Sequence, residues 1–359
     1  MANARTPPCA GGGQALQSSL SHTAGGKYPI KSSPLPILGF LLMACAPSGR
    51  QQEVAEPLAV AAVLDASPIQ PVPAITQLDP AQLALGERLF NDKGLSKDGT
   101  VACASCHSLE TGGVDRMRTS IGIGGAVGPI NAPSVFNSSL NFVQFWNGRS
   151  DSLEDQAGGP LTAGAEMGNT WPVALATLRA DASYVSEFGK AYPSGVTETN
   201  VRHAIATFER SLVTPDAPFD RYLRGDTTAL SEQAAAGYQN FVDFGCIACH
   251  QGAGIGGNMY QKFGVMGDYF SDRGNPTEVD LGRFLVTGAE ADRHVFKVPS
   301  LRNVDRTAPY FHDGSAETLE DAIGVMARYQ LGRKLQDGDV AELAAFLRSL
   351  TGTYQGRSL

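Results

Sequence analysis

The apolar positions of this 359-residue chain recur mainly with the spacing of an α-helix. Between residues 200 and 212 they fall three and four residues apart, which places them on one helical face. The same spacing follows Ser231 and returns between residues 340 and 350. Alternation of apolar and polar residues over strand length is missing, so we expect little sheet. The pattern predicts a mainly α-helical protein.

Two local signals mark where helices begin and end. Asp79 followed by Pro80 is typical of an N-cap and the first helical turn, so a helix should begin there and carry Leu85 and Leu89. The proline-rich stretch 214–218 interrupts the pattern and marks a domain boundary. We therefore expect one domain over residues 78–215 and a second over residues 216–359.

A Cys-x-x-Cys-His pentapeptide follows a predicted helix in each domain. The residues are Cys103, Cys106 and His107 in the first domain and Cys246, Cys249 and His250 in the second. Two cysteines at this spacing attach a haem through thioether bonds, and the adjacent histidine binds its iron. Disulfides and zinc half-sites are the alternatives, but an adjacent histidine is poorly placed to complete a zinc tetrahedron. The sequence predicts two covalently bound haem c groups in two cytochrome-c-like domains.

Long glycine-rich loops follow each pentapeptide, over roughly residues 108–150 and 251–300. Loops of this length inside a compact domain usually have a function. Each haem needs a cover over its face, and we expect these loops to provide it.

The N-terminal residues predict export. Residues 35–44 are apolar, which suits a signal peptide and is too short to span a bilayer. Cys45 follows a lipoprotein-like cleavage sequence, so we expect a leader over residues 1–45 and a lipid anchor at Cys45; an ordinary signal peptide is the alternative. Residues 46–77 have the composition of a flexible tether. The expected location is the periplasm, with the protein tethered to a membrane as a lipoprotein.

The charge pattern argues against nucleic acid as a partner. The formal net charge is −8 and lysine and arginine form no cluster.

Over about residues 80–350 the chain resembles the bacterial di-haem cytochrome c peroxidases. The segments that carry the resemblance are 112–115, 119–122, 131–133, 144–149, 163–167, 212–215, 308–312 and 330–332. The resemblance implies hydrogen peroxide as substrate, a small cytochrome c or cupredoxin as electron donor, and a homodimer.

The resemblance also implies roles at the first haem. His107 would be its proximal ligand, and Gln156 and Glu166 match the active-site pair of the family. A carboxylate near the bound peroxide can take up and return a proton, and an amide can orient the substrate.

The chain departs from the family at Ile123, where many members carry a histidine that caps the first haem until the second is reduced. Isoleucine cannot bind iron. We therefore expect this haem to be five-coordinate or water-bound in the oxidised protein, without any need for reductive activation. Met117 is the alternative ligand, although it lies six residues earlier.

At the second haem the resemblance implies ligation by His250 and Met326. Leu319, Ile323 and Met326 also have the spacing of an ordinary helix core, which is the alternative for this methionine. A thioether ligand raises the potential of a haem, so electrons would enter there.

Further residues take roles from the same resemblance. Trp146 would lie between the haems and shorten the path for electrons. Asn131, Thr307 and Pro309 match residues that hold one Ca²⁺ ion, to which side-chain and backbone oxygens are suited.

Two other functions remain open from the sequence. One is a di-haem oxidase of the methylamine-utilisation type that modifies a partner protein; it has tyrosine where this chain has Met326. The other is a non-enzymatic di-haem electron carrier, against which the uncapped first haem argues.

Overall fold

The computed structural model describes residues 67–74 and 77–359. The predicted leader, Cys45 and most of the predicted tether lie outside the described residues. The described residues are mainly helical with short strands, which confirms the predicted fold class. Within them, no helix is long and apolar enough to cross a membrane.

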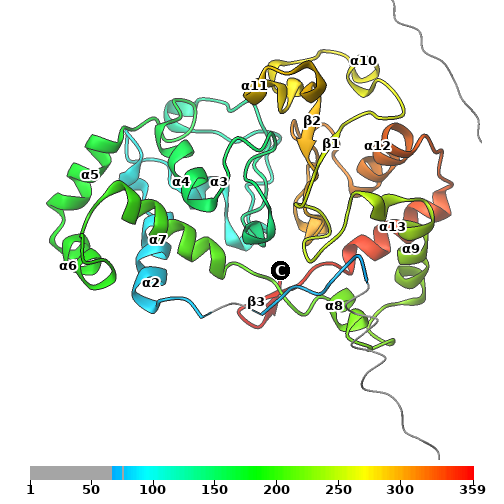
Figure 1. The fold of residues 1–359 in the computed structure, drawn as a ribbon, viewed down its shortest axis with the longest axis horizontal. Coiled ribbons are helices and arrows are strands. Elements are labelled where there is room, and N and C mark those ends of the chain that lie inside the picture. Colours follow the sequence, from blue (N-terminus) through cyan, green and yellow to red (C-terminus); the bar gives the residue numbers. More distant parts are fainter. Residues whose placement is uncertain (1–66, 75–76) are drawn as a thin grey trace, which may run out of the picture. The chain divides into compact units, whose positions relative to one another are not determined.

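The helices that precede the 214–218 stretch form one set, which we call the first lobe (Figure 1). They are α2 (Pro80–Phe90), α3 (Cys103–Cys106), α4 (Leu153–Thr162), α5 (Trp171–Ala180), α6 (Ala182–Ala191) and α7 (Glu198–Ser211).

The elements that follow this stretch form the second lobe (Figure 1). Its helices are α8 (Pro218–Leu223), α9 (Glu232–Asp243), α10 (Tyr269–Arg273), α11 (Phe284–Thr287), α12 (Leu319–Leu331) and α13 (Asp337–Arg348). Its strands form two antiparallel pairs, β1 (Tyr260–Lys262) with β2 (Val295–Lys297), and β3 (Thr353–Tyr354) with β4 (Arg357–Ser358).

The same helix crossing occurs in both lobes. α2 packs on α7 and α9 packs on α13. A Cβ atom added at Gly86 in α2 would lie 1.9 Å from the carbonyl oxygen of Ala204, and one at Gly237 in α9 would lie 1.9 Å from that of Glu342. Only glycine allows this approach. The repeat supports two cytochrome-c-like units, each with a haem pentapeptide beside its helix pair.

The predicted helix starts agree with the structure. Asp79 caps α2, and its side chain accepts hydrogen bonds from the backbone N–H groups of Ala81 and Gln82. Ser231 caps α9 through the N–H of Ala234. The helix expected from residue 200 begins slightly earlier, because Thr197 caps it through the N–H of Asn200.

Each lobe has its own hydrophobic core. The buried residues of the first core lie between Leu85 and Leu212, and those of the second are Ile69 and residues between Phe219 and Leu350. The end of the chain departs from this division, because Tyr354 and Leu359 pack against the first core.

Part of the predicted tether is packed structure. Ile69 and Val72 are buried, and the carbonyl oxygen of Gln70 accepts a hydrogen bond from Arg302 at 2.9 Å. The N–H of Val72 donates to Asp220. The flexible tether predicted for residues 46–77 is therefore wrong for residues 67–74, because their composition did not reveal that Ile69 joins the second core and that Val72 is buried.

The pair β1–β2 and its flanking loops connect the lobes (Figure 1). The N–H of Lys297 donates to the carbonyl oxygen of Trp146 at 2.8 Å, and the N–H of Phe142 donates to that of Gly257 at 2.8 Å. A third bond runs from the N–H of Asn131 to the carbonyl oxygen of His312. Backbone bonds thus hold the loop around Trp146 against the second lobe.

Candidate functional site: two haem-binding pentapeptides

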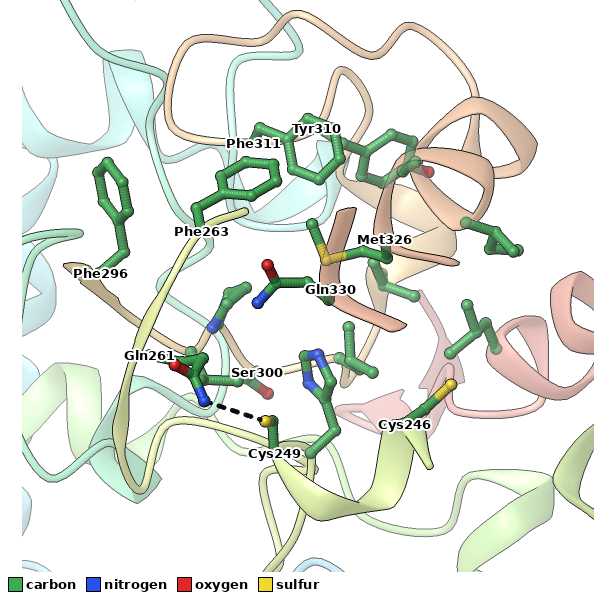
Figure 2. Close-up of a pocket in the computed structure, with 18 of the residues that line it drawn as sticks. Cys246, Cys249, Gln261, Phe263, Phe296, Ser300, Tyr310, Phe311, Met326 and Gln330 are labelled. Atoms are coloured by element: carbon green, nitrogen blue, oxygen red, sulfur yellow. Dashed lines mark hydrogen bonds between the residues drawn. The ribbon is translucent and has the colours of Figure 1, made fainter. Parts of the chain in front are cut away.

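A cavity of about 420 Å³ lies beside the second pentapeptide. Both lobes line it: Cys246, Cys249 and His250 come from the second lobe, and Trp146 and Asn131 from the first. Figure 2 shows Met326 reaching into this cavity from α12, while Cys246 and Cys249 border it from the opposite side. Most of the lining is apolar, as a buried macrocycle requires.

The two pentapeptide histidines have the same hydrogen-bonding arrangement. The Nδ1 atom of His107 lies 3.3 Å from the carbonyl oxygen of Gly113, and that of His250 lies 3.2 Å from the carbonyl oxygen of Ile255. A proton on Nδ1 that is donated to a carbonyl leaves Nε2 free to bind a metal. Burial lowers the pKa of His107, and it lowers that of His250 to about 4. Both rings are thus neutral near pH 7, as iron ligands must be.

The four pentapeptide cysteines are free thiols in the structure. Burial raises the pKa of Cys103 to about 12 and that of Cys246 to about 11. Protonated thiols next to a histidine with a free Nε2 are the groups that a haem needs for attachment and ligation. The residues at both pentapeptides therefore fit a haem.

Met326 lies on the cavity side of α12, together with Leu319 and Ile323. The helix is held at its start by a capping box, in which Thr318 and Asp321 exchange hydrogen bonds. Buried Ile323 and half-buried Met326 share one face, so the core pattern seen in the sequence is real. The same face borders the cavity, and the methionine sulfur is available to a metal there.

Glu166 lies in the turn after α4, close to the first pentapeptide. Its carboxylate is near enough to raise the pKa of both Cys103 and Cys106. Burial raises the pKa of Glu166 itself, and the positive charge of Arg149 opposes part of that shift. A carboxylate whose pKa is raised by burial holds a proton more readily than an exposed one, which suits a group that accepts and returns a proton.

Arg149 was not singled out by the sequence analysis as a residue of its own. Its guanidinium carbon lies 3.3 Å from the ring centroid of Phe145, a cation–π contact that holds the side chain. Only the pairing with Glu166 in the fold gives it a place at the site.

Gln156 projects from α4, ten residues before Glu166, and is half-buried. Its side-chain amide makes no hydrogen bond to the part of the chain that the structure describes. The amide is thus free to bind a ligand. Gln156 and Glu166 make no hydrogen bond to each other, so they could act together only through a ligand bound to both.

The loop that carries Ile123 is fixed against Glu166. The N–H of Ile123 donates to the carbonyl oxygen of Glu166 at 2.9 Å. A Cβ atom at Gly122 would lie 2.0 Å from the carbonyl oxygen of Ala165, and one at Gly168 would lie 2.3 Å from Cδ1 of Ile123. The isoleucine packs on the first core. Met117, the alternative ligand, is 38% exposed on the surface of the same loop region.

Trp146 stands at the contact between the lobes. Its indole N–H donates to the carbonyl oxygen of Asn131 at 2.9 Å, and its ring makes an edge contact with His312 at 6.4 Å. Its own carbonyl accepts the N–H of Lys297. The tryptophan belongs to the first lobe and borders the cavity beside the second pentapeptide, which suits a residue between two redox groups.

Asn131, Thr307 and Pro309, the residues predicted to hold calcium, all border the cavity. Asn131 donates its side-chain amide to the carbonyl oxygen of Met117, and Thr307 donates its hydroxyl to that of Val304. These bonds leave the side-chain oxygen of Asn131 free to accept a cation.

A nearby cluster of acidic side chains is paired with an arginine rather than with a metal ion. Asp280 and Asp313 both bond Arg273 at 2.6 Å, and His312 bonds Asp280 at 2.7 Å. Despite burial, these hydrogen bonds keep the pKa of Asp280 well below its usual range. The cluster is satisfied by its own cation and needs no metal.

Glu209 on α7 is a buried acid that the sequence analysis did not single out. It is 5% exposed, and its Oε2 atom has no hydrogen-bond partner among the described residues. Burial raises its pKa to about 8, and its charge in turn raises the pKa of Cys103. A single buried glutamate in a helix gives no signal in sequence.

Replacing Glu209 with glutamine should flatten the pH dependence of stability. Between its ordinary pKa of 4.5 and about 8, only the folded protein keeps this proton. The free energy of unfolding therefore falls by about 1.4 kcal/mol for each pH unit as pH rises. Unfolding in guanidinium chloride gives the free energy of unfolding at pH 5 and at pH 7. Its decrease between these two pH values should be about 3 kcal/mol smaller in Glu209→Gln than in the parent. Glu110→Gln, an exposed control, should match the parent; equal losses in all three proteins would contradict the assignment.

Comparisons with known proteins place these features in a family. Residues 80–228 match the model of the di-haem cytochrome c peroxidase family. The chain is 48% identical over 288 residues to cytochrome c peroxidase Ccp of Escherichia coli, covering 80% of this chain and 62% of that protein. It is 46% identical over 286 residues to cytochrome c551 peroxidase of Nitrosomonas europaea, covering 79% of this chain and 84% of that protein.

A solved structure of a MauG-like protein associated with microbial copper homeostasis has the same fold. Its TM-score is 0.69 at 30% identity, over 79% of this chain and 93% of that chain. With two Cys-x-x-Cys-His pentapeptides whose histidines share one hydrogen-bonding arrangement and with relatives of this identity, the chain belongs to the di-haem cytochrome c peroxidase family.

Proposed function

We propose that this protein reduces hydrogen peroxide to water with electrons from a small cytochrome c or cupredoxin. The observation that carries the proposal is the difference between the surroundings of the two pentapeptides. Near the first lies the half-buried carboxylate of Glu166, whose pKa is raised, and α4 carries Gln156, whose amide makes no hydrogen bond within the described residues. The cavity beside the second is bordered by both His250 and Met326. The first site would thus offer acid–base groups to a substrate, and the second would offer a sulfur ligand.

Cys103, Cys106 and His107 would hold the first haem c, which would supply the redox centre for cleavage of the peroxide bond. Glu166 accepts a proton from the nearer peroxide oxygen and returns it to the leaving oxygen. Gln156 orients the substrate through its free amide. Arg149 lowers the energy of the charged carboxylate, which keeps Glu166 ready to act as a base.

Cys246, Cys249 and His250 would hold the second haem c, which would supply a redox centre for electrons from the donor. Met326 would offer a thioether ligand that raises the potential of this centre, because sulfur favours ferrous iron. Trp146 lies at the lobe contact, with its ring anchored to Asn131, and shortens the path to the first haem.

Several finer features belong to the same proposal. Asn131, Thr307 and Pro309, which border the cavity at the lobe junction, bind one Ca²⁺ through side-chain and backbone oxygens. The protein acts in the periplasm, where haem c is attached and small cytochromes are present. We also propose that a lipid is attached to Cys45 and that the protein assembles as a homodimer.

The similarity to a MauG-like structure leaves one alternative function, a di-haem oxidase that modifies a partner protein. Met326 in the second pocket favours the peroxidase, because the oxidase has a tyrosine at this position. A carrier function has no use for the carboxylate of Glu166 and the amide of Gln156 beside the first haem.

Steady-state turnover tests the proposal. Mixed with reduced cytochrome c and hydrogen peroxide, the protein should oxidise two equivalents of cytochrome for each peroxide consumed, since two electrons and two protons convert one peroxide into two waters. Cytochrome c with no peroxide should stay reduced. Failure to oxidise either a cytochrome or a cupredoxin donor would contradict the proposed function.

A further inference from the structure

Lys297 is a buried cation beside the second haem pocket. It is 6% exposed and borders the same cavity as Cys246, Cys249 and His250. Its ammonium group makes no hydrogen bond or ion pair within the described residues. Burial alone lowers its pKa to about 8. A buried charge with no partner is costly, so such a lysine requires an explanation.

The backbone holds Lys297 firmly at this position. It is the last residue of β2 and pairs with Tyr260 of β1. Its N–H donates to the carbonyl oxygen of Trp146 at 2.8 Å, and the next N–H, of Val298, donates to Met259 at 3.0 Å. The lysine therefore borders the cavity from a fixed strand at the lobe contact.

The other charges around the cavity are accounted for. Arg302 also borders it, but its guanidinium lies 2.8 Å from Asp220 and bonds the carbonyl oxygens of Ala253 and Gln70. His312 bonds Asp280. The described lining contains no aspartate or glutamate. The cavity thus has a surplus positive charge at Lys297, and a haem brings two propionate carboxylates.

We propose that Lys297 forms an ion pair with a propionate of the second haem and thereby raises the reduction potential of that haem. The inference rests on the proposed function only in placing a haem c at Cys246 and Cys249. The proposal makes Lys297 a positioning residue in the pocket of the second haem, through which electrons would enter. A fixed ammonium compensates the carboxylate and favours the extra electron of the reduced haem.

The test compares three variants of the full holoprotein by spectroelectrochemical titration of both haems. Lys297→Met keeps the length of the side chain and removes the charge, Lys297→Arg keeps the charge, and Lys262→Met removes an exposed lysine from the adjacent strand. In Lys297→Met the ratio of reduced to oxidised second haem at a fixed potential should fall at least tenfold, which corresponds to about 59 mV. Lys297→Arg and Lys262→Met should stay near the parent.

An unchanged second-haem potential in Lys297→Met would overturn the inference, as would a shift confined to the first haem. If Lys297→Met does not fold, Lys297→Gln takes its place, and resonance Raman bands of the propionates should shift in either variant. Turnover of the parent with peroxide is measured separately. A shifted potential in a protein that does not consume peroxide would support the ion pair and contradict only the proposed function.

Discussion

Replacement of Glu166 with glutamine is expected to slow peroxide cleavage by about 10²- to 10⁴-fold. Glutamine keeps the size of the side chain but cannot accept and return the proton. Both haem spectra should stay near those of the parent, because Glu166 is not an iron ligand in this account. Stopped-flow mixing of the oxidised protein with peroxide measures the step directly.

The pH profile gives a second sign of the same group. Burial raises the pKa of Glu166, so the carboxylate should lose its basic form as pH falls through a value above the ordinary one. The rate of the parent should therefore decline on the acid side, and Glu166→Gln should lose this limb. Glu110→Gln, an exposed substitution beyond the first pentapeptide, should behave as the parent does. A parental rate in Glu166→Gln would remove Glu166 from the mechanism.

Replacement of Met326 with histidine is expected to lower the potential of the second haem by on the order of 0.3 V, within the span that axial ligands set. At about 59 mV per decade, this change shifts the electron distribution by about five powers of ten. Electrons from a donor would then no longer collect at this haem, and turnover with reduced cytochrome c should fall steeply. Titration of both haems measures the change.

Met117→Leu is the matched control, because it removes an exposed methionine from the first lobe. It should leave both potentials unchanged, which also tests Met117 as the alternative ligand of the first haem. If Met326→His left the second potential at the parental value, Met326 would be an ordinary residue of the α12 core.

Local signals explain what the sequence could predict. The pentapeptides hold all their chemistry within five residues, and the caps at Asp79 and Ser231 act on the next turn of the chain. The apolar residues of α7 recur with helical spacing, and the face that they form is the buried one. These features depend on neighbours in sequence, so helices and haem attachment could be read before the fold was known.

Residues whose role depends on distant partners could not be read in this way. Glu166 and Gln156 could be named only through the family resemblance, because a lone polar residue gives no pattern. Arg149 and Lys297 gain meaning only where the fold brings them to Glu166 and to the cavity. The packing of residues 67–74 was missed for the same reason, since Ile69 and Val72 are buried by a lobe that begins far along the chain.

The reaction of the fully oxidised protein with peroxide tests the central claim most directly. The claim is that the first haem is open to substrate at rest, because Ile123 packs on the core and isoleucine cannot bind iron. The parent, mixed with peroxide in the absence of any reductant, should react at once, while Ile123→His should react only after its second haem has been reduced. A parent that stays inert until it is reduced would contradict the account.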